Sequence, residues 1–189
     1  MKNFFDLIAP VYEKIRPDAE KVFHVFTSMV EFMPSDVVVD IGGGSGALAK
    51  FIVGKVNKIT VIDSSEKMLE QCRKHSGVVC MNGRAENLPL QNDSVDKVII
   101  ADAFHHFPDQ AKAIQEIRRV LKPGGAAVLA EFNPGTFGGR LIVLLEYFLR
   151  LGSVFYRPQK LADLFSRQNF KTLVSDEGKK DYYLVCKKN

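Results

Sequence analysis

The sequence of 189 residues contains few cysteines. The three, Cys72, Cys80 and Cys186, show no C-x-x-C spacing. This argues against a disulfide framework and against a zinc knuckle, and it favours a reducing compartment. We therefore expect no disulfide framework, no bound metal and a cytoplasmic location.

Long hydrophobic runs and a strong charge of one sign are also missing. Residues 1–10 lack the basic start and long apolar run of a signal peptide. The most apolar stretch, residues 141–156, is interrupted by Glu146 and Arg150, so no transmembrane helix is expected. The net charge is only +4, with basic residues spread along the chain, which argues against a nucleic-acid partner. At 46% hydrophobic and 25% charged residues, the composition predicts one globular domain, residues 1–189.

A glycine-rich segment after an apolar run is the most informative stretch of the chain. Residues 37–41 are mostly β-branched, as in a strand buried on both faces, and Gly42, Gly43 and Gly44 follow before a helical spacing begins. A strand that ends in glycines and opens a helix gathers N–H groups and the positive helix end at one point. Asp40 adds a carboxylate there. This pattern predicts a nucleotide-type ligand site.

Strand and helix patterns alternate along most of the chain. Further strands are expected at residues 58–63, 77–81, 94–101 and 126–132, and helices at 18–32, after 65 and at 110–121. Such alternation predicts a Rossmann-like, doubly wound α/β fold with its ligand at the carboxyl ends of the strands. Asp63 ends the second strand, 23 residues after Asp40, where dinucleotide-type folds carry a ribose-binding acid.

Beyond residue 132 the pattern changes. Residues 137–152 are expected to form a helix that is apolar over most of its circumference, and residues 161–168 a shorter helix. Strands at 170–175 and 182–186, joined by the polar turn 176–178, must be antiparallel. The expected sheet is therefore seven-stranded and mostly parallel, with a C-terminal antiparallel hairpin.

The glycine segment alone allows more than one cofactor. Gly42-x-Gly44-x-x-Ala47 satisfies a dinucleotide pattern, so an NAD-dependent oxidoreductase is one alternative. The chain leaves little room for a second mononucleotide half plus a substrate domain. The Walker pattern is absent, which argues against phosphoryl transfer.

Five motifs in order make the chain resemble the class I S-adenosylmethionine-dependent methyltransferases. They are residues 38–46 (VVDIGGGSG), 62–69 (IDSSEKML), 84–89 (RAENLP), 104–109 (FHHFPD) and 121–125 (LKPGG). Within that superfamily, residues 5–12 (FDLIAPVY) resemble the opening of the ubiquinone/menaquinone-biosynthesis C-methyltransferases. The resemblance implies methyl transfer to a small, apolar or aromatic acceptor. A regulatory module that binds the cofactor without turnover is the non-enzyme alternative.

The resemblance also implies roles for single residues toward S-adenosylmethionine. Gly42, Gly43 and Gly44 would let its methionine part lie against the chain, with Asp40 and the backbone of Ala101 at its amino end. Asp63 would bind both ribose hydroxyls. Around the adenine the resemblance implies Ser64, Met68 and the amide of Ala85. The position of Arg84 usually holds an Asp, and arginine has no acceptor, so that contact is lost, moved to Glu86 or replaced by stacking.

The acceptor side is less defined. His105 and His106 follow the fourth strand, close to where the methyl group should lie, and are candidate bases. The apolar surplus of residues 137–152 allows core packing, a lipophilic substrate wall, a dimer contact or peripheral membrane contact. Residues 1–33 are expected to form a helical lid in which Tyr12 reaches the ligand. Residues 34–132 would form the cofactor-binding core and 133–189 the substrate side, in a monomer or homodimer.

Overall fold

The computed structural model describes residues 2–15, 18–175 and 180–189. The predicted turn at residues 176–178 lies outside these ranges. Among the described helices, none is long and apolar enough to cross a membrane.

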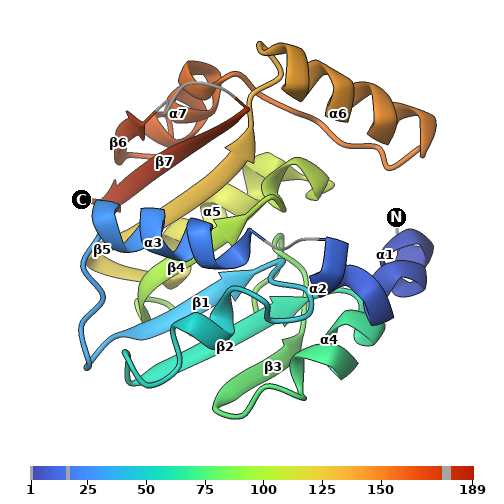
Figure 1. Ribbon diagram of the computed structural model, residues 1–189. Helices are drawn as coiled ribbons and strands as arrows, with labels where there is room; N and C mark the ends of the chain where they lie inside the picture. The colour runs from blue at the N-terminus through green and yellow to red at the C-terminus, as the bar shows by residue number, and fades with distance from the viewer. Residues whose placement is uncertain (1, 16–17, 176–179) are drawn as a thin grey trace.

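A seven-stranded sheet forms the centre of the molecule, in the order β3-β2-β1-β4-β5-β7-β6 (Figure 1). Its strands are β1 Val37–Ile41, β2 Lys58–Asp63, β3 Val78–Asn82, β4 Val95–Ala101, β5 Leu121–Phe132, β6 Phe170–Ser175 and β7 Asp181–Lys188. The pairs among the first five strands are parallel, and β7 is antiparallel to both β5 and β6. The predicted mostly parallel sheet with an antiparallel C-terminal pair is confirmed.

The connecting helices differ from the sequence pattern mainly at their ends. They are α1 Lys2–Ile8, α2 Tyr12–Ile15, α3 Ala19–Met29, α4 Glu66–Cys72, α5 Gln110–Val120, α6 Phe137–Phe148 and α7 Pro158–Ser166. The helix expected after the glycines is a series of turns with one 3-10 turn, Ala49–Phe51. The helix α6 stops before the predicted end at residue 152, because Arg150 and Gly152 both adopt positive φ angles, 53° and 68°.

Two hydrophobic clusters cover the two faces of the sheet. Strand alternation divides β1, so that Val39 and Ile41 join one cluster and Val38 the other. The first cluster includes α5 and α7, and the second includes α3. In Figure 1, α3 crosses the near face of the sheet and α5 lies behind it. Burial on both faces accounts for the continuous β-branched run that marks β1 in the sequence.

The cysteine expectation is wrong at one point. Cys72, at the end of α4, and Cys80, in β3, form a disulfide with Cα atoms 6.3 Å apart. Spacing rules miss this pair because the turn from α4 into β3 returns the chain and brings the two residues side by side. The third cysteine, Cys186, is free and buried, and its burial raises the pKa of its thiol.

Lys188 fastens the last strand to the rest of the sheet. Its ammonium donates to the carbonyls of Arg118 and Leu121, at 2.8 and 2.6 Å, and pairs with Asp93 at 2.7 Å. A cation that satisfies carbonyls at a helix end also opposes the negative end of the helix dipole. The neighbouring Lys187 is exposed.

We predict that Lys188→Ala lowers the free energy of unfolding by about 1.5–3 kcal/mol, the contribution of hydrogen bonds to a charged group. Urea unfolding monitored by circular dichroism measures this difference. The matched variant Lys187→Ala should change stability by no more than about 0.5 kcal/mol. Equal effects of the two substitutions would contradict the assignment.

Candidate functional site

The carboxyl ends of the parallel strands meet around the glycine segment. The N–H of Gly42 donates to the carbonyl of Ile62 at 2.7 Å, which joins the end of β1 to β2. Gly42 and Gly44 have φ angles of 72° and 55°, a region that side chains disfavour. A Cβ on Gly43 would lie 2.5 Å from the carboxylate of Asp40. All three glycines are therefore required by the backbone path.

A cavity of about 370 Å³ opens on one side of this segment, a size typical of small-molecule sites. It is lined by ten residues of the first three strands and the segments that follow them: Ile41, Gly42, Gly44, Ile62, Asp63, Ser64, Ser65, Met68, Asn82 and Gly83. The remaining wall consists of Phe5, Tyr12, Arg84, Ala85, Glu86, Asp102, Ala103, His106, Phe107 and Pro108. Sequence reasoning assigned no site role to Phe5, Asn82 and Phe107. Phe5 and Phe107 lie within quoted motifs but are apolar members of them, and Asn82 ends β3 outside any motif.

A smaller hollow of about 40 Å³ lies on the other side of the glycines. It is lined in part by Asp40, Gly43 and Ala101, and Tyr12 borders both spaces. The glycine segment and Tyr12 therefore separate a wide compartment from a narrow one. An elongated ligand with a bulky end and a small end matches this division.

Asp63 stands at the carboxyl end of β2 and holds the glycine segment in place. Its Oδ2 accepts from the N–H of Gly44 at 2.9 Å, and its Oδ1 accepts from the N–H of Ser65 at 2.8 Å. Burial raises the pKa of Asp63 above its ordinary value, although these N–H groups favour the charged form. Each carboxylate oxygen has a second lone pair, so Asp63 can also accept from a ligand.

Asp40 is the least satisfied polar group near the glycines. Its side chain is buried, and neither carboxylate oxygen has a hydrogen-bond partner among the described residues. Burial, and next the charge of Asp63, raise the pKa of Asp40 to about 8. A carboxylate in this position is suited to a cationic ligand group, which would favour its charged form.

The far end of the larger cavity is formed by the loop after β3. Ala85 is buried there, and Glu86 is 8% exposed. The side chain of Arg84 is 64% exposed, with its Nε 3.4 Å from Glu86 Oε2. The acceptor that this end of the cavity offers therefore belongs to Glu86 and not to position 84.

The two histidines follow β4 in the 3-10 turn Phe104–His106, but they have different surroundings. His106 lines the larger cavity and lies 5.0 Å from the ring of Phe5. His105 is 2% exposed, and its Nδ1 lies 2.5 Å from Glu131 Oε2. Burial would lower the pKa of His105, but Glu131 and Glu146 raise it to about 10.

Glu131 and Glu146 are functional candidates that sequence reasoning missed. Glu131 is an acid inside the apolar run of β5, and its 3% exposure shows that it is not a surface residue. That interruption of a buried strand was the available signal. Glu146 is the single acid of α6, and it turns toward the histidines, 3.6 Å from His105 Nε2.

The N-terminal segment is docked beside the cavity. Asp6 Oδ1 lies 2.5 Å from the hydroxyl of Ser65, which also caps α4. Glu13 accepts from Lys50 at 2.9 Å, and its other oxygen lies 2.8 Å from His75 Nε2. The segment thus contacts the elements on both sides of the glycine loop.

Most of the sequence-predicted site residues border these two spaces. The larger cavity contains Tyr12, Gly42, Gly44, Asp63, Ser64, Met68, Arg84, Ala85 and His106. The smaller contains Asp40, Gly43 and Ala101. His105 lines neither space and is buried behind His106.

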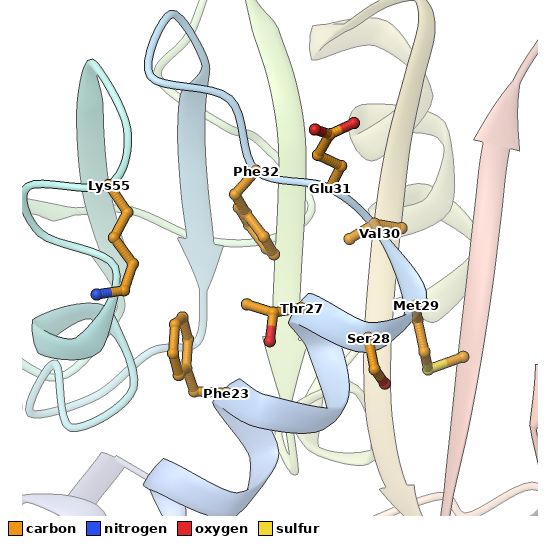
Figure 2. A pocket seen from close by; sticks show the side chains of 8 residues that line it. All are labelled: Phe23, Thr27, Ser28, Met29, Val30, Glu31, Phe32 and Lys55. Atoms are coloured by element: carbon orange, nitrogen blue, oxygen red, sulfur yellow. The ribbon is translucent and has the colours of Figure 1, made fainter.

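A more voluminous but open hollow, about 560 Å³, lies elsewhere (Figure 2). It is bordered by α3, by residues 30–32 leading into β1, and by Lys55, whose amine lies 5.6 Å from the ring centroid of Phe23. It is near the amino end of β1, away from the carboxyl edge that gathers the predicted residues. Position and chemistry therefore favour the glycine-bordered cavity as the functional site.

Comparison with known proteins gives a consistent family. A model described as a methyltransferase domain matches residues 39–129. The rice chloroplastic 2-methyl-6-phytyl-1,4-hydroquinone methyltransferase 2 is 32% identical over 139 residues, covering 71% of this chain and 38% of the relative. A ubiquinone/menaquinone biosynthesis C-methyltransferase of Geotalea daltonii is 26% identical, covering 96% of this chain and 88% of the relative.

Among solved structures, an S-adenosylmethionine-dependent methyltransferase of Thermotoga maritima, described as a possible histamine N-methyltransferase, has the same fold. Its TM-score is 0.83 at 23% identity, over 100% of both chains. The chain spans only about two fifths of the length of the rice relatives, 38% and 41%.

The raised pKa of Asp40 predicts a pH dependence of stability. A carboxyl whose pKa rises from 3.8 to about 8 on folding keeps its proton in the folded state while the unfolded state loses it. The free energy of unfolding should therefore fall as the pH rises through this window. The Asp40→Asn variant has no carboxyl at this position and should not show this loss. The free energy of unfolding of the variant, relative to that of the wild type, should therefore rise by on the order of 2–4 kcal/mol between pH 5 and 8.

Urea unfolding at several pH values, without added ligand, measures this difference. Asp109→Asn provides a control at an exposed helix cap. Wild type and Asp40→Asn curves that remain parallel from pH 5 to 8 would mean that Asp40 does not carry the shift.

Proposed function

We propose that this chain, like the S-adenosylmethionine-dependent methyltransferases that it resembles, transfers the methyl group of S-adenosylmethionine to a ring carbon of a lipophilic, quinol-type acceptor. The observation that carries the cofactor assignment is the orphaned carboxylate of Asp40 beneath the glycine segment. Both rice and Geotalea relatives named above are methyltransferases of quinone-type compounds. That shared chemistry supports the acceptor class.

The donor and acceptor groups of the site fit this cofactor. A ribose diol offers two O–H donors, and Asp63 retains acceptor capacity beyond the bonds to Gly44 and Ser65. The methionine end carries an ammonium group, which would satisfy the carboxylate of Asp40 in the narrow compartment. Gly44 lies beside this ligand space, where a Cβ would be 3.8 Å from Tyr12 and 4.0 Å from Asp63. The glycine is required by its positive φ angle of 55°.

The adenine end departs from the family pattern, and we propose that Glu86 compensates. Arg84 has no acceptor for an exocyclic amino group. Glu86 is buried, lines the cavity and carries acceptor oxygens. Its tie to Arg84 at 3.4 Å would orient the carboxylate toward the base.

When bound, S-adenosylmethionine supplies a sulfonium methyl group that is already electrophilic. The residues of this chain need to align the acceptor carbon opposite the leaving sulfur, exclude water and accept a proton. The acceptor carbon would gain the methyl group with S-adenosylhomocysteine as the leaving group, the ring C–H proton would pass to water, and the hydroxyl would regain the proton held by the base. Proximity and orientation can lower the barrier by about 7–11 kcal/mol in ideal cases.

Of the two histidines, His106 is better placed to accept a proton from a phenolic hydroxyl. It borders the cavity, between Phe5 and the segment that follows α6. A deprotonated phenol donates electron density to the ring carbons, which makes them better nucleophiles. His105 is too deeply buried to touch the acceptor directly.

The surface of α6 supports a lipophilic acceptor. Large apolar side chains on this helix face outward, with Leu141 60% and Phe148 72% exposed, and α6 projects from the body of the molecule in Figure 1. Arg140 and Arg150 flank this apolar surface. We propose that α6 contacts the surface of a membrane that contains the acceptor, a quinol with a long isoprenoid tail.

Methyl transfer itself can be tested with radiolabelled S-adenosylmethionine and a prenylated hydroquinone in lipid vesicles. We expect a methylated ring product and one equivalent of S-adenosylhomocysteine. Asp63→Ala should reduce cofactor affinity by roughly 10- to 150-fold, from about 1.5–3 kcal/mol of lost charged hydrogen bonding. The exposed Asp163→Ala serves as the matched control.

The alternatives predict different results. A regulatory module would bind S-adenosylhomocysteine without turnover on any acceptor. An NAD-dependent oxidoreductase would be stabilised by NADH and not by S-adenosylhomocysteine in a thermal-shift comparison. Either outcome would overturn the proposed reaction.

We propose further that the N-terminal lid, within residues 1–33, closes over the bound cofactor. Amide exchange in residues 4–12 should slow on adding S-adenosylhomocysteine, by up to about 100-fold at 100 Kd of ligand. Glu13→Gln, which weakens the ties to Lys50 and His75, should restore part of the exchange. Hydrogen exchange with mass spectrometry measures both effects. Protection that is complete before ligand is added would make the segment a fixed part of the core.

A further inference from the structure

Three potential metal ligands from two separate elements converge behind the cavity wall. They are His105 and His106, in the 3-10 turn after β4, and Glu146, on α6. One ligand atom of each lies within 4.8 Å of the other two. Glu146 Oε1 is 3.6 Å from His105 Nε2, and Glu146 Oε2 is 3.9 Å from His106 Nδ1.

Two of these atoms are buried without a hydrogen-bond partner in the described part of the chain. They are His105 Nε2 and Glu146 Oε2. His105 is only 2% exposed, so bulk water does not satisfy its ring nitrogen. A buried polar atom without a partner destabilises the folded protein. Both atoms can therefore coordinate a ligand between the histidines and α6.

The opposite edge of the His105 ring is held in the manner of a metal ligand. Its Nδ1 lies 2.5 Å from Glu131 Oε2, and the other oxygen of Glu131 accepts from the N–H of Phe104 at 2.9 Å. A ligating histidine commonly donates its second N–H to a carboxylate, which fixes the ring and its tautomer. Phe155 stacks on the ring at 4.3 Å between centroids. The orientation of Nε2 is therefore set by the fold.

The charge around this point also favours a dication. Within the described residues, the ion pairs of Glu131 and Glu146 are with the two histidines, and neither acid pairs with a lysine or an arginine. Among charged side chains the two carboxylates therefore face only imidazoles, and a divalent ion that replaces an imidazole proton would keep their charge compensated.

We propose that His105 Nε2, His106 Nδ1 and a carboxylate oxygen of Glu146 bind a divalent first-row transition metal, with Glu131 as the positioning residue for His105. Two imidazoles and one carboxylate suit Zn²⁺, Fe²⁺ or Co²⁺ better than Mg²⁺ or Ca²⁺. Adjacent ligands of a tetrahedral ion with bonds of about 2.1 Å lie about 3.4 Å apart. The ligand atoms lie within 4.8 Å of one another, so binding requires the widest pair to approach by up to about 1.4 Å.

The inference changes two earlier points. The sequence suggested no metal, because its cysteines show no metal-ligand spacing. With the metal bound, His106 would no longer act as a base, because an imidazole that binds a metal through Nδ1 keeps its proton on Nε2. The metal would also link α6 to the turn after β4. The hydroxyl of Ser153 lies 2.9 Å from His106 Nδ1. The ion would replace this hydroxyl as the partner of that nitrogen.

The site can be tested without the methyl donor or acceptor, so its failure is distinct from failure of the proposed reaction. Tag-free full-length protein, stripped with a chelator, is titrated calorimetrically with Zn²⁺ and optically with Co²⁺. We expect one site per chain, a Kd of about 1 µM or below, and a visible Co²⁺ band typical of low coordination number. Glu146→Gln and His106→Gln should each weaken binding at least tenfold, and Glu131→Gln by about 10–100-fold.

His24→Gln is the matched control, since His24 is an exposed histidine beside an acid, Glu20. It should leave Zn²⁺ affinity and the Co²⁺ band unchanged. Circular dichroism of each variant verifies folding, and the cavity-lining His106→Gln decides the case if a buried variant does not fold. The proposal is overturned by absence of saturable binding up to 100-fold above the expected Kd, by unchanged affinity in His106→Gln, or by equal loss in His24→Gln.

Discussion

The close approach of the glycine segment to the buried carboxylate of Asp40 is the constraint on which the rest of the site depends. Each glycine meets a different demand. A Cβ on Gly42 would lie 2.7 Å from the Cβ of Ala103, and one on Gly43 would lie 2.5 Å from Asp40. Gly44 has a positive φ and donates its N–H to Asp63. A side chain at Gly42 would therefore collide with the turn after β4, and one at Gly43 would collide with Asp40. A side chain at Gly44 would strain the backbone that is bonded to Asp63 of β2.

The same arrangement lowers the stability of the folded protein. Asp40 is buried and Asp63 beside it is partly buried, and loss of hydration raises the pKa of both carboxyls. Asp63 offsets part of its burial by accepting two backbone N–H bonds, whereas Asp40 has none within the described residues. A cationic ligand end that satisfies Asp40 would add stability on binding, since a ligand that binds only the folded state shifts the folding equilibrium. Sites that are strained or unsatisfied without ligand commonly trade stability for function in this way.

The sequence predicted the elements whose signal is local and failed where the signal depends on tertiary contacts. The β-branched run of β1 and the terminal position of Asp63 were sufficient to locate the sheet edge, because strand period and chain reversal fix where carboxyl ends meet. The Cys72–Cys80 bond escaped because α4 and β3 become neighbours only after the chain turns between them. Glu131 was missed because an acid inside an apolar strand is a weak signal until its partner, His105, is known.

The helix α6 shows that the surroundings of one residue can decide how the apolar composition of a helix is interpreted. Its apolar surplus suggested core packing as the simplest account, yet Leu141, Leu145 and Phe148 are exposed. Glu146, which looked like a break in an apolar run, is instead the residue that turns toward the core. The polarity of this helix is thus inverted relative to an ordinary surface helix, with its acid inside and its apolar side chains outside.

A helix of this kind is stable only if its inward charge is compensated and its outward apolar face is covered. The histidine cluster with its proposed metal and the proposed lipid surface would provide these two partners, on the acceptor side of the molecule.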